Sequence, residues 1–286
     1  MNRHGIFGNG MLEATIAANV EAALIEDIGS GDLTALLLPE NEMVSARVIV
    51  RENAVLCGIP WFDAVMNVLD SRTEIEWSYR EGDWMTAGSE VCRMTGSVRS
   101  LLTGERTCLN FLQLLSAVAT ATREYVKLVA GTSARIYDTR KTLPGLRVAQ
   151  KYAVFVGGGE NQRMALYDAI LIKENHIAAA GGIRQALQAA FRHTGVPVQI
   201  EVETIEQLNE ALAAGAKSVM LDNFSLEDMR EAVRITKESK TGAVLEASGG
   251  IDRDTVRAIA ETGVDRISVG ELTKHVKATD FSMRIV

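Results

Sequence analysis

Residues 198–221 read VQIEVETIEQLNEALAAGAKSVML and carry the pattern that decides the fold. A short, strand-like apolar run opens the stretch, and Thr204 then begins a helical pattern with Gln207 three residues later, as in a capping box. Gly215 ends that pattern, and a second short apolar run closes the stretch. A strand, a helix and a strand in this order predict a βαβ unit with parallel strands.

The same unit is repeated along the C-terminal part of the chain. Ser225 carries another helix-capping signal, and Gly263 ends a further helical pattern. Because strand-like runs recur at intervals of roughly 20 to 35 residues, a closed or nearly closed α/β barrel is favoured over an open doubly wound sheet. Chemistry in such barrels lies at the carboxyl ends of the strands. The predicted strands are residues 134–137, 169–172, 198–202, 218–221, 243–245 and 266–269, and the polar or glycine residues at their ends are Asp138, Lys173, Glu201, Asp222, Ser248 and Gly270.

The N-terminal part has a different pattern. Residues 11–27 have the apolar spacing of a helix and end in a glycine-rich stop. Alternating apolar and polar residues at 45–52, 74–79 and 90–95 predict an antiparallel sheet with one exposed face. A long helix at 104–130 then leads into the repeated units. We therefore expect a small α+β domain before the barrel.

Composition excludes several kinds of protein. The formal net charge of -7 provides no basic surface for nucleic acid, and no apolar run approaches the roughly 20 residues of a membrane span. The first residues lack the pattern of a secretory signal, so we expect a cytoplasmic protein. Cys57, Cys92 and Cys108 are far apart and without metal-ligand spacing, which predicts reduced, buried thiols.

Basic residues gather in one part of this acidic chain. Arg140 and Lys141 follow a predicted strand, Arg163 follows three glycines and Lys173 follows the next strand. Together with Arg106 they predict a pocket for a small anion, because guanidinium groups pair bidentately with carboxylates and ammonium groups add compact charge. A Schiff base at Lys173, as in barrel aldolases, is an alternative use of that residue.

Acidic side chains occupy two neighbouring strand ends. Period-two alternation places Glu201 and Glu203 on one face of their strand, and Asp222 follows the next strand. These carboxylates suit a hydrated Mg2+ or ribose hydroxyls, since Mg2+ commonly uses one or two carboxylates together with substrate oxygens. The alternative is structural: a buried acid paired with Lys173 or with an arginine.

Glycines follow the last two strands. Residues 248–250 join a strand to a helix, and Gly270 ends the final strand. Backbone N–H groups near a helix start form an anion site, and the last loops of a barrel commonly bind phosphate. We expect His275 to support that phosphate, and we interpret His176 as a histidine that stabilises its loop.

Several longer motifs occur in a fixed order along the chain. They are ED at 26–27 with GDLT at 31–34, ERT at 105–107 with NFL at 110–112, DTRKT at 138–142 with PGLR at 144–147, KYA at 151–153, LIKENHI at 171–177, LDNF at 221–224 and LEASGGI at 245–251. In these motifs the chain resembles the bacterial quinolinate phosphoribosyltransferase family over essentially its whole length.

The resemblance implies both a fold and a set of residue roles. The implied fold is an incomplete α/β barrel at residues 116–272 and an N-terminal α+β open sandwich at residues 1–115, completed by the tail 273–286. The implied enzyme is a Mg2+-dependent homodimer in which Arg106 reaches the partner's site. The implied ligands of quinolinate are Arg106, Arg140, Lys141, Gln162, Arg163 and Lys173. The implied ligands of phosphoribosyl pyrophosphate are Glu201, Asp222, Ser248, Gly249, Gly250, Gly270 and His275. Of these residues, Glu201 and Asp222 also bind the metal, and Lys141, Glu201 and Asp222 act in catalysis.

Two positions depart from the family's pattern. The family reads GG-x-NHR where this chain has GGENQR at 158–163, so Gln162 stands in place of a histidine. Glutamine can donate a hydrogen bond to a carboxylate but carries no positive charge. Glu271 adds a negative charge next to Gly270, where the family has a small residue.

The implied reaction joins quinolinate to phosphoribosyl pyrophosphate, with release of pyrophosphate and CO2, and yields nicotinate mononucleotide for NAD biosynthesis. Two alternatives remain. One is a paralogue with another acceptor, either nicotinate or the substrate of the related molybdenum-locus proteins, and Gln162 is the feature that favours it. The other is a catalytically inactive barrel that binds phosphorylated metabolites.

Overall fold

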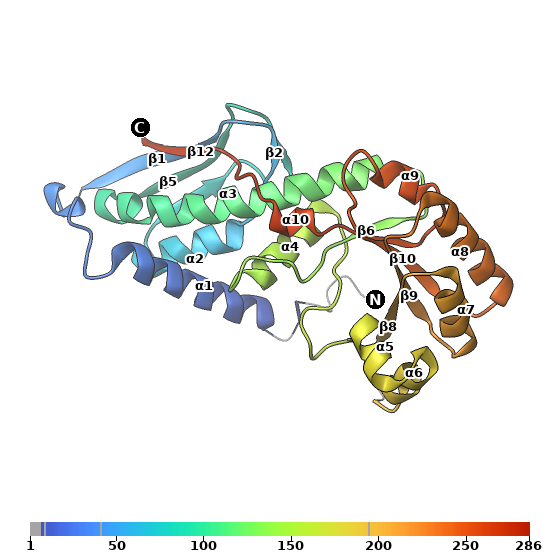
Figure 1. The fold of residues 1–286 in the computed structure, drawn as a ribbon. Coiled ribbons are helices and arrows are strands. Elements are labelled where there is room, and N and C mark those ends of the chain that lie inside the picture. Colours follow the sequence, from blue (N-terminus) through green and yellow to red (C-terminus); the bar gives the residue numbers. More distant parts are fainter. Residues whose placement is uncertain (1–6, 9, 41, 194) are drawn as a thin grey trace. The chain divides into compact units, whose positions relative to one another are not determined.

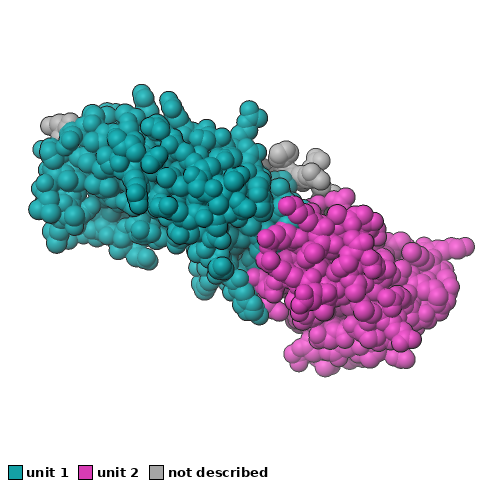
Figure 2. All heavy atoms as spheres, turned by 90° about the horizontal axis from the view of Figure 1, so that it is seen from above, with its two compact units in different colours: residues 1–123, 142–158, 272–286 teal, residues 124–141, 159–271 magenta. Residues whose placement is uncertain are grey.

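The computed structural model describes residues 7, 8, 10–40, 42–193 and 195–286, and the chain divides into two compact units (Figure 2). Each unit has a sheet of its own. Residues 142–158 cluster with the N-terminal part of the chain, although the predicted barrel, residues 116–272, includes them. Unit 1 comprises residues 1–123, 142–158 and 272–286, and unit 2 comprises residues 124–141 and 159–271.

Unit 2 is built on six parallel strands. In chain order these are β6 (Arg135–Tyr137), β7 (Ile170–Ile172), β8 (Val198–Val202), β9 (Ser218–Asp222), β10 (Val244–Ser248) and β11 (Arg266–Ser268). From β7 to β11 each strand pairs with the next one in the chain, and β6 pairs with β11 (Figure 1). Because β6 and β7 stand at the two edges of the sheet, the described strands form an incomplete barrel, as predicted.

Helices follow the strands of unit 2, as the alternating pattern predicted. The Oγ1 atom of Thr204 accepts a hydrogen bond from the backbone N–H of Gln207, and Ser225 Oγ accepts one from Asp228, so both expected capping residues begin helices. Gly215, after the first of these helices, has a φ of 94°, in the left-handed region that favours glycine. The helices of unit 2 are α5 (Glu174–Ala180), α6 (Ile183–Phe191), α7 (Ile205–Ala213), α8 (Leu226–Ser239) and α9 (Val256–Ala260). The short helix α10 (Glu271–Lys274) follows β11, and all of its residues except Glu271 belong to unit 1.

Unit 1 contains a four-stranded antiparallel sheet. Its strand order is β12 (Phe281–Ile285), β1 (Met43–Val50), β5 (Glu90–Ser97) and β3 (Glu74–Trp77). The last strand of the chain therefore lies at an edge of this sheet, where Met283 is opposite Val48 of β1. The other elements of unit 1 are α1 (Met11–Ile28), η1 (Ala35–Leu37), α2 (Ile59–Leu69), α4 (Arg147–Gly157) and the strand pair β2 (Ala54–Val55) and β4 (Trp84–Met85).

The long helix α3 (Val98–Leu128) begins in unit 1 and ends in unit 2. It starts earlier than the predicted residue, Gly104, which lies inside the helix. A Cβ atom on Gly104 would lie 2.8 Å from side-chain atoms of both Met66 and Leu69 of α2. This glycine therefore permits close packing of α2 on α3 and does not mark a helix end.

Two expectations from composition can be compared with the structure. None of the described helices is long and apolar enough to cross a membrane. Cys57, Cys92 and Cys108 are buried free thiols, as expected. Burial raises the pKa of each of these thiols, which keeps them in the unreactive protonated form.

Candidate active site

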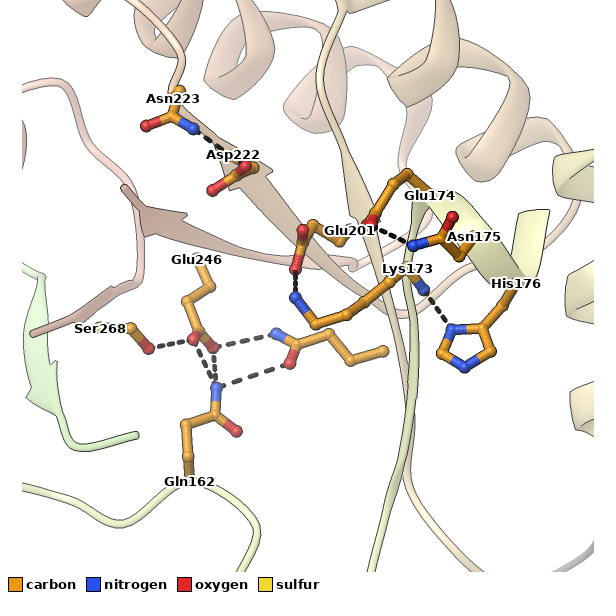
Figure 3. Close-up of polar contacts among 11 residues, drawn as sticks. Gln162, Lys173, Glu174, Asn175, His176, Glu201, Asp222, Asn223, Glu246 and Ser268 are labelled. Atoms are coloured by element: carbon orange, nitrogen blue, oxygen red, sulfur yellow. Dashed lines mark hydrogen bonds and ion pairs between the residues drawn. The ribbon is translucent and has the colours of Figure 1, made fainter. Parts of the chain in front are cut away.

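An ion pair joins the carboxyl ends of β7 and β8. Lys173 follows β7, and its Nζ atom lies 2.8 Å from Oε2 of Glu201 in β8 (Figure 3). The side chain of Glu201 is only 9% exposed, whereas that of Lys173 is 45% exposed. The Nζ atom of Lys173 is thus engaged by a carboxylate, which supports the structural alternative of an ion pair at this strand end over a Schiff base. His176 accepts a hydrogen bond at Nδ1 from the backbone N–H of Lys173 at 3.0 Å, which stabilises this loop.

Glu201 and Glu203 both line one small cavity, in keeping with the expectation that the two acids lie on one face, but they differ in burial. β8 ends at Val202, so the alternation of a strand stops before Glu203. The side chain of Glu203 is exposed, and its backbone N–H donates to Gln207 Oε1 at 2.8 Å. The buried carboxylate at this strand end is therefore that of Glu201.

Asp222 ends β9, beside β8, and is held by the next residue. Asn223 Nδ2 donates to Asp222 Oδ2 at 3.0 Å (Figure 3), and the backbone N–H of Asn223 donates to the carbonyl oxygen of Ser248 at 3.0 Å. A Cβ atom on Gly249 would lie 2.1 Å from Oδ1 of Asn223, and Gly249 has a φ of 102°. Only glycine fits here, so the loop after β10 approaches the Asp222 loop as backbone without side chain.

Lys141 lies beside Gly270 at the end of β11. A Cβ atom on Gly270 would be 3.3 Å from Cδ of Lys141 and 3.9 Å from its Nζ. The backbone N–H of Lys141 donates to Thr139 Oγ1 at 3.1 Å, which shapes the turn after β6. The structure thus brings an ammonium group to the glycine that was expected to bind phosphate.

Arg140 and Arg163 form a pair of like charges. Burial lowers the pKa of the Arg163 guanidinium, and the positive charge of Arg140 lowers it further, while the carboxylate of Asp168 offsets part of the decrease. Arg163 Nη1 donates to the carbonyl oxygen of Ala169 at 3.2 Å. The Nε atom of Arg140 is buried and has no hydrogen-bond partner among the described residues. Two guanidinium groups that repel each other, one with an unused donor, are arranged to bind an anion.

A buried acid inside the barrel escaped the sequence analysis. Glu246 in β10 is fully buried, and it accepts hydrogen bonds from Gln162 Nε2, Ser268 Oγ and Gln199 Nε2, the last at 2.9 Å (Figure 3). Alternation along β10 could have revealed it, because Glu246 shares a face with Ser248. It was missed because it lies in the strand and not at its end.

A second buried acid, Asp138, anchors the loop that carries Gln162. Its Oδ1 atom accepts from the backbone N–H of Gln162 at 2.9 Å, and Oδ2 accepts from Asn161 Nδ2 at 2.6 Å. Asp138 was expected at a strand end with a functional role. The structure shows that its carboxylate organises the neighbouring loop.

Known proteins match the chain along its length. The model of the quinolinate phosphoribosyl transferase C-terminal domain matches residues 118–284, and that of the N-terminal domain matches residues 32–116. The chain belongs to the quinolinate phosphoribosyltransferase family. Probable nicotinate-nucleotide pyrophosphorylases (carboxylating) of Synechocystis sp. and Bacillus subtilis are 41% and 40% identical, over 92% and 91% of this chain and 90% of each relative. The solved nicotinate-nucleotide pyrophosphorylase of Francisella tularensis is 47% identical, with a TM-score of 0.91 over 96% of both chains.

The departure from the family's pattern at Glu271 has a structural explanation. Its carboxylate accepts a hydrogen bond from the hydroxyl group of Tyr125 in α3. Burial raises the pKa of that hydroxyl, and the bond to Glu271 raises it further, so Tyr125 stays a donor. The carboxylate next to Gly270 is therefore held toward Tyr125 of α3 by a hydrogen bond and keeps its negative charge.

Two residues with roles implied by the family resemblance belong to unit 1. Arg106 lies on α3 and His275 follows α10, and both are exposed. The other implied residues, from Arg140 to Gly270, lie in unit 2.

We expect the two halves of the Lys173–Glu201 ion pair to contribute unequally to stability. Replacing Lys173 by Met leaves a buried carboxylate without its cation and should lower the free energy of unfolding by about 2 kcal/mol. Replacing Glu201 by Gln leaves a half-exposed ammonium group that water can solvate, and should cost less than about 1 kcal/mol. Urea unfolding of both variants at pH 7 measures the difference, and equal losses would contradict the assigned asymmetry.

Proposed function

We propose that this protein is a pentosyltransferase that moves the phosphoribosyl group of phosphoribosyl pyrophosphate to the ring nitrogen of quinolinate. The products are nicotinate mononucleotide, pyrophosphate and CO2, on the route to NAD. Family membership and the names of the relatives support the reaction class. The choice of quinolinate rests on the same family and names. The observation that carries the binding of an anionic acceptor is the Arg140–Arg163 pair, because two like charges and a buried Nε–H group with no partner among the described residues suit a carboxylate.

The acceptor is held by cations in this proposal. Arg140 and Arg163 bind mainly the carboxylate that is retained, and Lys173 adds a compact charge while it remains tied to Glu201. A bound dianion also relieves the repulsion between the two guanidinium groups. Gln162, implied as a further quinolinate ligand, has its amide hydrogens directed at Glu246, so its part in acceptor binding is indirect.

The donor is held by backbone and by carboxylates. The backbone of Ser248, Gly249, Gly250 and Gly270 binds the 5'-phosphate, with Lys141 beside Gly270 and His275 as further support. Glu201 and Asp222 face the ribose and act with Lys141 as the catalytic groups. Close approach of Gly249 to Asn223 supports this assignment, because a backbone without side chains leaves room for phosphate oxygens.

Mg2+ fits this set of donors when substrate oxygens complete its shell. Glu201 and Asp222 lie on neighbouring strands, and one oxygen of Glu201 remains outside the ion pair with Lys173. No group of three or more His, Cys, Asp and Glu side chains in the described part of the chain could hold the ion alone. We therefore propose that Glu201 and Asp222 hold Mg2+ together with the donor, and that the bound ion neutralises the departing pyrophosphate.

Catalysis is then mainly positioning and electrostatic stabilisation. As the bond from C1' to pyrophosphate breaks, C1' gains positive charge near the carboxylates of Glu201 and Asp222. The ring nitrogen, oriented by Arg140 and Arg163, attacks the opposite face. The ribosylated nitrogen is cationic and accepts the electron pair left when the 2-carboxylate departs as CO2, and the ring carbon is then protonated. We propose that the enzyme acts in the cytoplasm, because its three cysteines are free thiols and not disulfides.

Labelled quinolinate tests the proposed function. The protein is incubated with Mg2+, phosphoribosyl pyrophosphate and quinolinate labelled in the 2-carboxylate, with nicotinate as a parallel acceptor. We expect labelled CO2 and mononucleotide in equal amounts from quinolinate and no mononucleotide from nicotinate. Arg140→Ala should raise the quinolinate KM at least tenfold, since a charge-assisted hydrogen bond contributes about 1.5 to 3 kcal/mol.

Arg135→Ala is the matched control for Arg140→Ala. Arg135 is also in unit 2 but is 62% exposed and paired with Glu160, so the same charge is lost away from the site. Its loss should leave both Michaelis constants unchanged. Product from nicotinate alone, no product, or equal kinetics of the Arg140 and Arg135 variants would refute the proposal or the assignment of Arg140.

The metal assignment predicts a specific defect. Asp222→Asn keeps the size of the side chain and removes its charge, so the Mg2+ concentration for half-maximal rate should rise by about tenfold. Asp254→Asn, at an exposed position between β10 and α9, is the control. Its rate should depend on the Mg2+ concentration as that of the wild-type protein does. An unchanged Mg2+ requirement in Asp222→Asn would remove this residue from the metal site.

Arg106 is proposed to complete the site of a partner subunit in a homodimer. Two variants with weakened quinolinate binding, Arg106→Ala and Arg140→Ala, can be co-expressed with different tags, purified through both tags and assayed at a quinolinate concentration at which each alone has little activity. In such mixed dimers one site of the two has every residue if Arg106 acts across the interface, so about half of the wild-type activity should return. Pure mixed dimers without activity would show that Arg106 does not act in this way.

A further inference from the structure

The carboxamide of Gln162 links a buried carboxylate to the backbone of Arg163. Its Nε2 atom donates to both oxygens of Glu246, and its Oε1 atom accepts from the backbone N–H of Arg163 at 3.4 Å. Since an ionised carboxylate can only accept, the amide nitrogen must face Glu246 and the amide oxygen must face Arg163. Both ends of the side chain are therefore used, and its orientation is determined.

Glu246 is a strong anchor for this side chain. It is fully buried, and its hydrogen-bond donors are the neutral groups of Gln162, Gln199 and Ser268. Hydrogen bonds to an ionised acceptor are about twice as strong as those between neutral groups. Gln199 and Ser268 belong to strands β8 and β11, whereas Gln162 comes from the loop that leads to Arg163. Among these three donors, Gln162 connects the interior of the barrel to that loop.

The loop needs such an anchor because Arg163 lies near a like charge. Arg140 acts on Arg163 by repulsion, and the guanidinium of Arg163 is held by the carbonyl oxygen of Ala169. The backbone of Gln162 is bound to Asp138, which leaves the side chain of Gln162 to hold the backbone N–H of Arg163 itself. The side chain of Gln162 thus adds a constraint on the backbone from which the Arg163 side chain extends toward the like charge.

We propose that Gln162 is a positioning residue: anchored on Glu246, it holds Arg163 beside Arg140 so that both can bind one acceptor carboxylate. This inference rests on the proposed function, because it assumes that the two arginines receive the carboxylate of quinolinate. It assigns Gln162 no direct contact with the acceptor. The neutral amide is suited to the task because it serves an anion at one end and an N–H group at the other.

Calorimetric binding of quinolinate to the intact protein tests the proposal. Gln162→Leu keeps the approximate length and removes both hydrogen bonds, so the Kd for quinolinate should rise at least tenfold while the KM for phosphoribosyl pyrophosphate stays within twofold. Ser268→Ala is the matched control, since it also removes one donor from Glu246 but leaves the loop untouched. We expect wild-type affinity for quinolinate in that control. If Gln162→Leu does not fold, Gln162→Asn replaces it, because the shorter amide cannot reach Glu246 and carries the same expectation.

A double-mutant cycle with Glu246→Gln separates positioning from general stability. If Gln162 acts through Glu246, each single variant raises the Kd for quinolinate, and the Kd of the double variant is no higher than the higher of the two single-variant values. Additive losses, or equal affinities of the Gln162 and Ser268 variants, would overturn the inference and leave the proposed function intact. Failure of the wild-type protein to bind quinolinate would instead refute the proposed function, and the inference with it.

Discussion

Burial of carboxylates inside a parallel sheet is the constraint on which the candidate site depends. Asp138, Glu201 and Glu246 are all buried in unit 2, and an isolated buried charge costs several kcal/mol. Each is satisfied in a different way. Asp138 accepts from the loop at 161–162, Glu201 is paired with Lys173, and Glu246 accepts from neutral side chains. The groups that satisfy these acids belong to the site, so the requirement to neutralise the interior also positions the functional residues.

The arginines Arg140 and Arg163 bring two like charges together, whereas Glu201 is paired with a cation. An acidic chain places Arg140 and Arg163 where they repel each other, and the buried Nε–H group of Arg140 has no partner among the residues that the structure describes. Such an arrangement lowers stability in the free protein, and a ligand that supplies negative charge recovers the lost free energy on binding. Since Lys173 already has a carboxylate partner, it contributes less to this imbalance than the two arginines. In the proposed function, the attraction for an anionic acceptor therefore depends on the arginine pair more than on the number of basic residues.

In the proposed function, closely packed backbone binds phosphoribosyl pyrophosphate, whereas charged side chains bind the acceptor. Gly249 contacts Asn223 at a distance that leaves no room for a side chain, and Gly270 lies against the flexible side chain of Lys141. A bare backbone offers N–H groups to phosphate oxygens without the desolvation of further charged side chains. The two halves of the reaction would thus be recognised by different physics, guanidinium charge for the acceptor and backbone dipoles with carboxylates for the donor.

Much of the fold could be predicted from local patterns, because apolar periodicity and helix caps are local signals. Thr204 and Ser225 begin helices where their hydrogen-bonding side chains indicate, and the six predicted strands exist. The pattern could not show that Gly104 is a packing contact, since the side chains it meets belong to another helix. Alternation placed Glu201 and Glu203 on one side but could not show that only Glu201 is buried, because burial depends on the neighbouring elements.

The site was predicted least well where its contacts join distant parts of the chain. Gln162 and Glu246 are 84 residues apart, and no periodicity relates them. The resemblance to the family marked Gln162 as unusual and suggested a contact with substrate, but chemistry alone leaves an amide free to face either way. Once Glu246 is seen beneath the loop, only one orientation satisfies an acceptor-only carboxylate. A neutral residue can then maintain a site for anions, because the residue beneath it already carries the charge that orients it.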